Sequence, residues 1–218
     1  MTALRALLPI AAAALTTTAA DAATYTFSEA DFLPGSMIVE AAAGPSGGQA
    51  ASGAGGTYTV TTGTGATTYT AHFMTGASLD LVGETIEEID FLIDFNVQSL
   101  QHAFGLVIEQ GGTYFINYHL TGFVTGWDVL SVDDLVASNI IGIDGSGNGT
   151  GINPNFGAGA DTLRFGFFTA NSLSNGASVI YDNLSITVTT APVPLPAGGA
   201  LLLLGLGGLG LVRRRRKA

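Results

Sequence analysis

Hydrophobic and polar residues alternate along the middle of this chain. In residues 89–97 the apolar series is Ile89, Phe91, Ile93, Phe95 and Val97, and the residues between them are Asp90, Leu92, Asp94 and Asn96. A period of two is the pattern of a β-strand with one buried face, because successive side chains of a strand point to opposite sides. We therefore predict a half-buried strand whose aromatic face points into a core.

Two hairpins are predicted where such segments flank glycine-containing turns. Phe104–Glu109 and Thr113–His119 are separated by Gln-Gly-Gly, and Tyr58–Thr62 and Thr67–Phe73 by a segment that begins Gly-Thr-Gly. Glycine adopts the positive φ angles that tight turns need. We expect each pair of segments to form neighbouring antiparallel strands.

The remaining segments complete an all-β prediction. Leu163–Thr169 and Val179–Thr189 are predicted as the last strands, and residues 41–56, mostly Ala, Gly and Ser, as a flexible loop. Only Ser131–Ser138 indicates a helix, of one or two turns, because Ser131 and Asp134 have the spacing of a capping box. Many short strands without helical crossovers favour an antiparallel β-sandwich, and we favour a jelly roll.

The N-terminus has the features of a secretory signal peptide. Arg5 supplies a positive charge, Ala6–Leu15 an apolar stretch, and Ala20-Asp21-Ala22 the small-x-small pattern that signal peptidase cleaves. An apolar stretch this short does not span a bilayer. We therefore expect export across the inner membrane, removal of residues 1–22, and a mature chain that begins at Ala23 or Thr24.

The C-terminus carries three features in a fixed order. Val193-Pro194-Leu195-Pro196-Ala197 is followed by an uncharged apolar run at 198–212 and then by Arg213-Arg214-Arg215-Arg216-Lys217. A helix over Ala197–Val212 is about 24 Å long, just short of the roughly 30 Å hydrocarbon core. The basic residues are expected to stay on the cytoplasmic side. We predict a short hydrophobic anchor helix that holds the chain transiently in the inner membrane.

This tail resembles the PEP-CTERM class of bacterial sorting signals, in the variant whose motif reads VPLPA. Members of the class are envelope proteins of Gram-negative bacteria. The resemblance implies that an exosortase, a membrane-embedded cysteine protease of the transpeptidase kind, cuts near Pro196-Ala197 and sends the body to the cell surface or extracellular matrix. An ordinary single-span tail anchor is the alternative. The chain then divides into a signal peptide at 1–22, a sandwich domain at 23–190, a Pro-rich sorting motif at 191–197, an anchor helix at 198–212 and a basic tail at 213–218.

The predicted mature domain is strongly acidic. Of the 17 Asp and Glu residues all but Asp21 lie in it, whereas of the 7 Lys and Arg residues only Arg164 does. Such a surface repels phosphate backbones, so we exclude nucleic acid as a partner. The chain has no cysteine, which excludes disulfides and cysteine-ligated metals.

The closing segment, Tyr181–Val188, contains an Asp-Asn step that leads into an alternating strand. It resembles the last strand of jelly-roll domains of the galactose-binding and concanavalin-like kinds. The resemblance implies a jelly roll and, by analogy alone, a sugar ligand.

Glu88, Asp90 and Asp94 share one face of the predicted strand. The segment resembles the catalytic strand of laminarinase-like glycosidases, which implies catalytic roles for Glu88 and Asp90. A retaining glycosidase needs an acid and a nucleophile about 5–5.5 Å apart. The third acidic residue of that motif belongs at position 93, where this chain has Ile93. We therefore interpret the carboxylates as the solvated face of an acidic protein and predict no catalytic residue.

Tyr114, Tyr118, Trp127 and Asp128 are the candidate carbohydrate-binding residues. Alternation places Tyr114 and Tyr118 on one face of their strand. Aromatic rings stack on the C–H faces of sugars, and neighbouring polar side chains bind the hydroxyls. The alternative is a buried aromatic core, which we favour slightly for Trp127.

Asp144, Ser146 and Asn148 place oxygen donors at every second residue of a Gly-rich loop. A tight loop uses this spacing to direct several oxygens at one hard cation. The carboxylate usual at the twelfth place is absent, and Asn155 stands there. We predict at most a weak calcium site and no other cofactor; the alternative is a Gly- and Asn-rich surface loop.

Two functions follow from these observations. The first is a non-enzymatic surface or matrix protein, associated with exopolysaccharide or biofilm matrix, whose processing partners are signal peptidase and an exosortase. The alternative is a glycan-active hydrolase that uses Glu88 and Asp90. A groove lined by these carboxylates and an aromatic ring favours the enzyme, whereas a flat, carboxylate-coated face favours the matrix protein.

Overall fold

The computed structural model describes most of the predicted mature domain, namely residues 22–43, 49–54, 56–62, 68–99, 102–122, 126–171 and 177–193. The predicted signal peptide up to residue 21, the motif from Pro194 onwards, the predicted anchor helix and the basic tail lie outside the described residues. Within the described part, no helix is long and apolar enough to cross a membrane.

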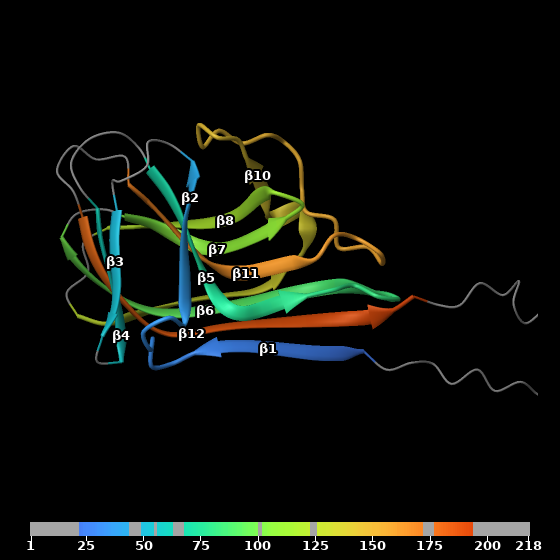
Figure 1. The fold of residues 1–218 in the computed structure, drawn as a ribbon, viewed down its shortest axis with the longest axis horizontal. Coiled ribbons are helices and arrows are strands. Elements are labelled where there is room, and N and C mark those ends of the chain that lie inside the picture. The colour runs from blue at the N-terminus through green and yellow to red at the C-terminus, as the bar shows by residue number, and fades with distance from the viewer. Residues whose placement is uncertain are drawn as a thin grey trace, which may run out of the picture.

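Two antiparallel sheets of six strands pack face to face (Figure 1). Sheet A has the order β3 (Gln49–Ala54), β4 (Thr57–Thr62), β12 (Ala177–Pro192), β6 (Glu84–Ser99) and β9 (Asp128–Leu135), with β1 (Ala23–Glu29) also paired to β12. Sheet B has the order β10 (Ile141–Ile143), β8 (Thr113–Thr121), β7 (His102–Gln110), β11 (Leu163–Asn171), β5 (Thr68–Leu79) and β2 (Met37–Ala43). The predicted all-β antiparallel sandwich is confirmed.

Strand β12 organises sheet A. One of its edges pairs with β6 from Ser178 to Pro192. Its other edge pairs first with β4, as far as Tyr181, and then with β1, from Leu184 onwards. The change of partner coincides with a register shift at Asp182–Ser185, where Asn183 has a φ of 49°. The bulge therefore lets the long strand β12 pair with two shorter strands, β4 and β1, along one edge.

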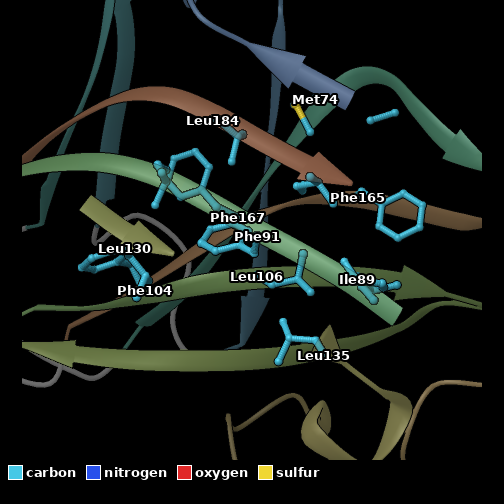
Figure 2. Close-up of a cluster of buried hydrophobic side chains, with 14 of the residues drawn as sticks. Met74, Ile89, Phe91, Phe104, Leu106, Leu130, Leu135, Phe165, Phe167 and Leu184 are labelled. Carbon is cyan, nitrogen blue, oxygen red and sulfur yellow. The ribbon is translucent and has the colours of Figure 1, made fainter. Parts of the chain in front are cut away.

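The core lies between the two sheets. The apolar residues predicted to face inward from 89–97 are all buried on β6, with exposed fractions of 0–3%. They meet Phe104, Leu106 and Phe167 from sheet B, whose exposed fractions are all 0% (Figure 2). The period of two in the sequence therefore reports the buried face correctly, since each strand of the sandwich presents one side to the opposite sheet.

One predicted hairpin is confirmed and the other is wrong. β7 and β8 pair across Gly111 and Gly112, whose φ angles are 58° and 81°. The segments that became β4 and β5 instead lie in opposite sheets: β4 pairs with the preceding strand β3 and with β12, and β5 pairs with β2 and β11. Alternation fixes which face of a strand is buried and leaves the partner open, and Thr-rich strands specify register weakly.

Two smaller predictions are also wrong. Within the predicted loop at 41–56, strand β2 extends to Ala43, and β3 occupies Gln49–Ala54. The predicted helix at Ser131–Ser138 is largely strand β9, followed by a single 3₁₀ turn at Ala137–Asn139. The capping-box spacing marks a bulge here: Asp134 has a φ of 56° and its N–H donates to Asp90 Oδ1 at 3.0 Å.

Gly166 lies where the backbones of β11 and β5 in sheet B approach each other closely. A Cβ at this position would lie 2.1 Å from the carbonyl oxygen of His72 on the neighbouring strand β5. Gly166→Ala is expected to lower the free energy of unfolding by about 1–3 kcal/mol, because backbone atoms must move to relieve the overlap. Chemical denaturation measures the change. Gly145→Ala is the control, since nothing lies within 4 Å of a Cβ there, and an equal loss in both variants contradicts the prediction.

Candidate functional site

The three carboxylates of β6 lie on the outer face of sheet A. Glu88 pairs with Thr189 and Asp90 with Thr187 on β12, and these threonines pair in turn with Thr24 and Thr26 on β1. Side chains of directly paired residues share a face. The surface around Glu88 and Asp90 is therefore built from carboxylates and hydroxyls.

Hydrogen bonds and charge repulsion both act on these carboxylates. Asp94 Oδ2 accepts a hydrogen bond from Asn183 Nδ2 at 2.7 Å, and Asp90 Oδ1 accepts from the backbone of Asp134. The pKa of Glu88 is raised above its ordinary value by desolvation and by the nearby carboxylates of Asp134 and Asp90. Desolvation is the largest cause of this upward shift, and repulsion from the neighbouring acids adds to it.

Tyr114 lies on the outer face of sheet B and is held by a charged network. Its hydroxyl donates to Glu40 Oε2 at 2.9 Å, and Arg164 donates to Glu40 Oε1 at 2.8 Å. The hydrogen bond from Arg164 keeps the pKa of Glu40 below its ordinary value, whereas desolvation and Glu40 raise the pKa of Tyr114 to about 12. Arg164 also lies over the ring of Phe73, 4.3 Å from its centroid. The hydroxyl of Tyr114 is therefore already used in a hydrogen bond within the protein.

Tyr118 is free of this network. It follows Tyr114 by four residues on β8 and shares its face, but 62% of its surface is exposed. The neighbouring Leu120 on the same face is 55% exposed. Together they form a small apolar surface at one end of sheet B.

Trp127 and Asp128 lie at the start of β9, in the other sheet. Trp127 is 51% exposed, so the alternative that this residue belongs to the core is wrong. Asp128 Oδ1 accepts the N–H of Val129 at 2.9 Å. The structure therefore keeps Tyr114 and Tyr118 together on sheet B and places Trp127 and Asp128 on sheet A.

The surroundings of Trp127 include amide side chains that sequence reasoning missed. Val129 pairs with Asp94, so the antiparallel register continues Trp127 towards Asn96 on the outer face of sheet A. Gln98 Nε2 donates to Asn96 Oδ1 at 2.7 Å. The alternation in 89–97 already assigned Asn96 to the polar face. Only the register of β6 with β9, in which Phe95 pairs with Asp128, makes Asn96 and Trp127 the next residues along the two chains. We call Trp127, Asp94, Asn96, Gln98 and Asn183 the Trp127 surface.

The carboxylate of the candidate calcium loop is used within the loop. Asp144 Oδ1 accepts the backbone N–H of Ser146 at 2.8 Å and that of Asn148 at 2.9 Å, and these hydrogen bonds lower the pKa of Asp144. Among the residues that the structure describes, no group of three or more His, Cys, Asp and Glu could hold a metal ion. A calcium ion would have to compete with the loop amides for this carboxylate, and the site remains a prediction.

The same loop lies against the outer face of sheet B. A Cβ on Gly147 would be 2.1 Å from the ring of Tyr69, so the loop backbone rests on that ring. Ile143, at the start of the loop, packs with Phe73, Val107 and other residues of a second buried apolar cluster, namely Ala71, Ile116, Phe168 and Ala170. The two outer faces therefore differ, since much of sheet B is covered while the Trp127 surface is open.

The described domain begins and ends at one corner. Ala23 at the start of β1 pairs with Thr190 near the end of β12, so the two strand ends lie side by side (Figure 1). Val193, the first residue of the predicted sorting motif, is 42% exposed and its N–H donates to the carbonyl oxygen of Gly83 at 2.9 Å. The rest of that motif lies outside the described residues.

No protein-family model matches the sequence, and comparison with curated proteins found no relative. Several solved structures are distantly similar. They include a protein of unknown function from Shewanella oneidensis MR-1 (TM-score 0.43, 12% identity, 84% of this chain and 92% of that one) and a family 11 carbohydrate-binding module of a cellulosomal cellulase of Clostridium thermocellum (0.40, 11%, 78% and 89%). A variant of a family 29 carbohydrate-binding module is also similar (0.43, 12%, 77% and 87%).

The exposure of Trp127 predicts that the fold does not depend on it. Trp127→Ala is expected to change the free energy of unfolding by less than about 1 kcal/mol, because half of the indole already contacts water. Phe91→Ala, at a position with 1% exposure, should cost about 3–5 kcal/mol. Thermal melts of the two variants compare them directly, and similar losses of stability would show that Trp127 is part of the core.

Proposed function

We propose that this protein is an exported bacterial surface or matrix protein, processed by an exosortase, whose jelly-roll sandwich binds neutral polysaccharide without cleaving it. The observation that carries the binding proposal is the half-exposed Trp127, which directly precedes Asp128, the β9 residue paired with Phe95, just as Asn96 directly follows Phe95 on β6 and accepts a hydrogen bond from Gln98. An exposed indole in a row of hydrogen-bonding side chains has both components of a sugar subsite.

The chemistry of the Trp127 surface suits a pyranose ring. The indole offers a flat apolar area for the C–H face of the sugar. Asn96 and Gln98 donate and accept hydrogen bonds, and the pair formed by Asn183 and Asp94 adds a further donor and acceptors. A sugar hydroxyl, which is itself both donor and acceptor, can exchange with any of these bonds at little cost.

Charge restricts the ligand class. The cation Arg164 lies in sheet B and is paired with Glu40 and, at 3.6 Å, with Glu109. The Trp127 surface instead shares sheet A with Glu88, Asp90 and Asp182. Anionic polysaccharides are repelled by such a face, so a neutral glucan is the proposed ligand.

The alternative remains a hydrolase that uses Glu88 and Asp90. Its resemblance rests on the carboxylates of β6, but their partners across the sheet are Thr189 and Thr187 rather than aromatic residues. The residues paired with Glu88 and Asp90 offer hydroxyls to solvent, and the indole of Trp127 lies farther along the sheet, beyond Asp94. This arrangement favours the binding protein over the enzyme.

The boundaries of the fold support the proposed processing. Strand β1 begins at Ala23, directly after the predicted signal-peptidase site, and β12 ends at Pro192, directly before Val193 of the Val-Pro-Leu-Pro-Ala segment. Cleavage after Ala22 and near Pro196-Ala197 would thus leave every described strand intact. The proposal also includes transient anchoring in the inner membrane and final location at the cell surface or in the extracellular matrix.

Retention of the full chain in native gels that contain a neutral β-glucan tests the binding proposal, with the protein kept in a non-ionic detergent. Trp127→Ala is expected to abolish the retardation, and Asn96→Ala to weaken it roughly fivefold, since one hydrogen bond to a sugar contributes about 1 kcal/mol. Tyr118→Ala is the control, an exposed aromatic residue on the other sheet. Loss of retention with Tyr118→Ala and not with Trp127→Ala refutes the Trp127 surface, and release of reducing sugar supports the hydrolase.

Intact-mass analysis of the protein extracted from the cell surface tests the processing proposal. The expected chain begins at Ala23 or Thr24 and ends near Pro196-Ala197. Replacement of both Pro194 and Pro196 by Ala should leave the protein in the membrane fraction. A surface chain that still carries Arg213–Lys217 overturns the proposal.

A further inference from the structure

Two histidines are buried where the two sheets meet. His72 on β5 and His102 on β7 have exposed fractions of 0% and 1%, and both point from sheet B towards sheet A. A fully buried imidazole in a core of this kind is expensive to protonate, because its charge loses the surrounding water. Neither residue belongs to the Trp127 surface.

His72 connects the sheets by hydrogen bonds. Its Nδ1 lies 3.1 Å from the hydroxyl of Tyr58 on β4 of sheet A, and its Nε2 lies 2.9 Å from Thr169 Oγ1 on β11 of sheet B. The ring also stacks on Phe167, with centroids 4.6 Å apart. Buried hydroxyls on both sides satisfy a neutral imidazole, which donates through one nitrogen and accepts through the other.

His102 faces a second tyrosine of sheet A without a hydrogen bond. Its ring centroid is 6.5 Å from that of Tyr181 on β12. In the described part of the chain, neither ring nitrogen of His102 nor the buried hydroxyl of Tyr181 has a hydrogen-bond partner. This part of the interface therefore holds polar atoms that gain nothing from their present contacts.

Among the residues that the structure describes, the groups that face these histidines include no carboxylate. The titratable neighbours are Tyr58 from β4 and Tyr181 from β12, and the charge of His102 also acts on His72. Thr169 and phenylalanine rings complete the surroundings. Burial lowers the pKa of His102 to about 4, and burial together with the charge of a protonated His102 lowers that of His72 to about 3. Burial raises the pKa of both tyrosines, so they stay neutral.

We propose that His72 and His102 are an acid-sensitive contact between the two sheets, so that mild acid separates the sandwich along its core. The proposal does not depend on the ligand of the Trp127 surface. Protonation of either ring places a positive charge between two hydrophobic sheets with no anion to balance it. The favourable response is unfolding, which returns the imidazole to water.

The direction of the pH effect follows from proton uptake. In the unfolded chain both histidines take up protons below about pH 6.5, whereas in the folded chain they do so only near pH 4 and pH 3. Between these values the unfolded state binds more protons, so stability falls as the pH falls. Each histidine lowers the folding constant about tenfold per pH unit, which amounts to roughly a thousandfold for both at pH 5.

Acidic residues also contribute to the pH dependence and must be separated from the histidines. The pKa of Glu88 is raised in the folded chain, so protonation of this carboxyl at low pH favours the fold. The pKa values of Glu40 and Asp144 are lowered, so their protonation disfavours it. Comparison of histidine variants with the parent chain cancels this contribution, since the carboxylates are unchanged. His102→Leu is suited to this comparison, because His102 has no hydrogen bond to lose within the described residues.

Thermal melts of the full chain in non-ionic detergent, followed by near-ultraviolet circular dichroism from pH 8 to pH 4, test the proposal. The midpoint of the parent chain is expected to fall by about 10 °C between pH 7 and pH 5, as a thousandfold change corresponds to about 4 kcal/mol. His102→Leu should be at least as stable at pH 7 and should lose about half of this fall. His72→Gln, which can still donate and accept, should remove most of the other half.

The exposed His119 is the matched control, and His119→Gln should follow the parent curve. If His102→Leu and His72→Gln both keep the full acid response, the proposal is wrong. NMR titration of the imidazole Hε1 resonances gives a second readout that does not require a variant. Resonances of His72 or His102 that titrate near pH 6.5 in the folded chain would also overturn the proposal.

Discussion

The pairing of β12 with β6 is the interaction on which the rest of the structure depends. These are the two longest strands, each of 16 residues, and they form the centre of sheet A. β12 joins the N-terminal strand β1 and the distant β4 to this centre, so the sheet is complete only when the last strand has been added. Because long-range pairings form late and all together, we expect the sandwich to fold cooperatively and slowly.

Because apolar and polar residues alternate along the strands, the inner and outer faces of each sheet differ in composition. The inner faces form an apolar core, within which only a few polar residues, among them His72 and His102, interrupt the hydrocarbon. The outer face of sheet B carries a second apolar cluster against which the loop after β10 packs. The outer face of sheet A remains polar and acidic, and Trp127, at the start of β9, is half-exposed. The acid-sensitive core and the proposed sugar surface are therefore separate features of one sandwich.

The distribution of charged side chains explains why the proposed ligand is neutral. Arg164 is fully engaged by Glu40 and Glu109 and lies over Phe73, so it stabilises sheet B internally and is not offered to a ligand. The carboxylates on sheet A have neighbouring hydroxyls and amides as partners instead. Such a surface hydrates well and repels other polyanions.

The sequence by itself determined the buried faces, the all-β class, the acidic surface and the β7–β8 hairpin, since each of these depends on residues that are close in the chain. Which strands pair was decided only by the tertiary structure: β4 and β5 separate into different sheets, and Ser131–Ser138 becomes a strand rather than a helix. The pairing of Phe95 with Asp128, which extends the β6–β9 register towards Asn96 and Trp127, was decided in the same way. The period of a strand shows which side is buried, but hydrogen bonds between distant strands choose the neighbours, and they do so by the packing of the whole core.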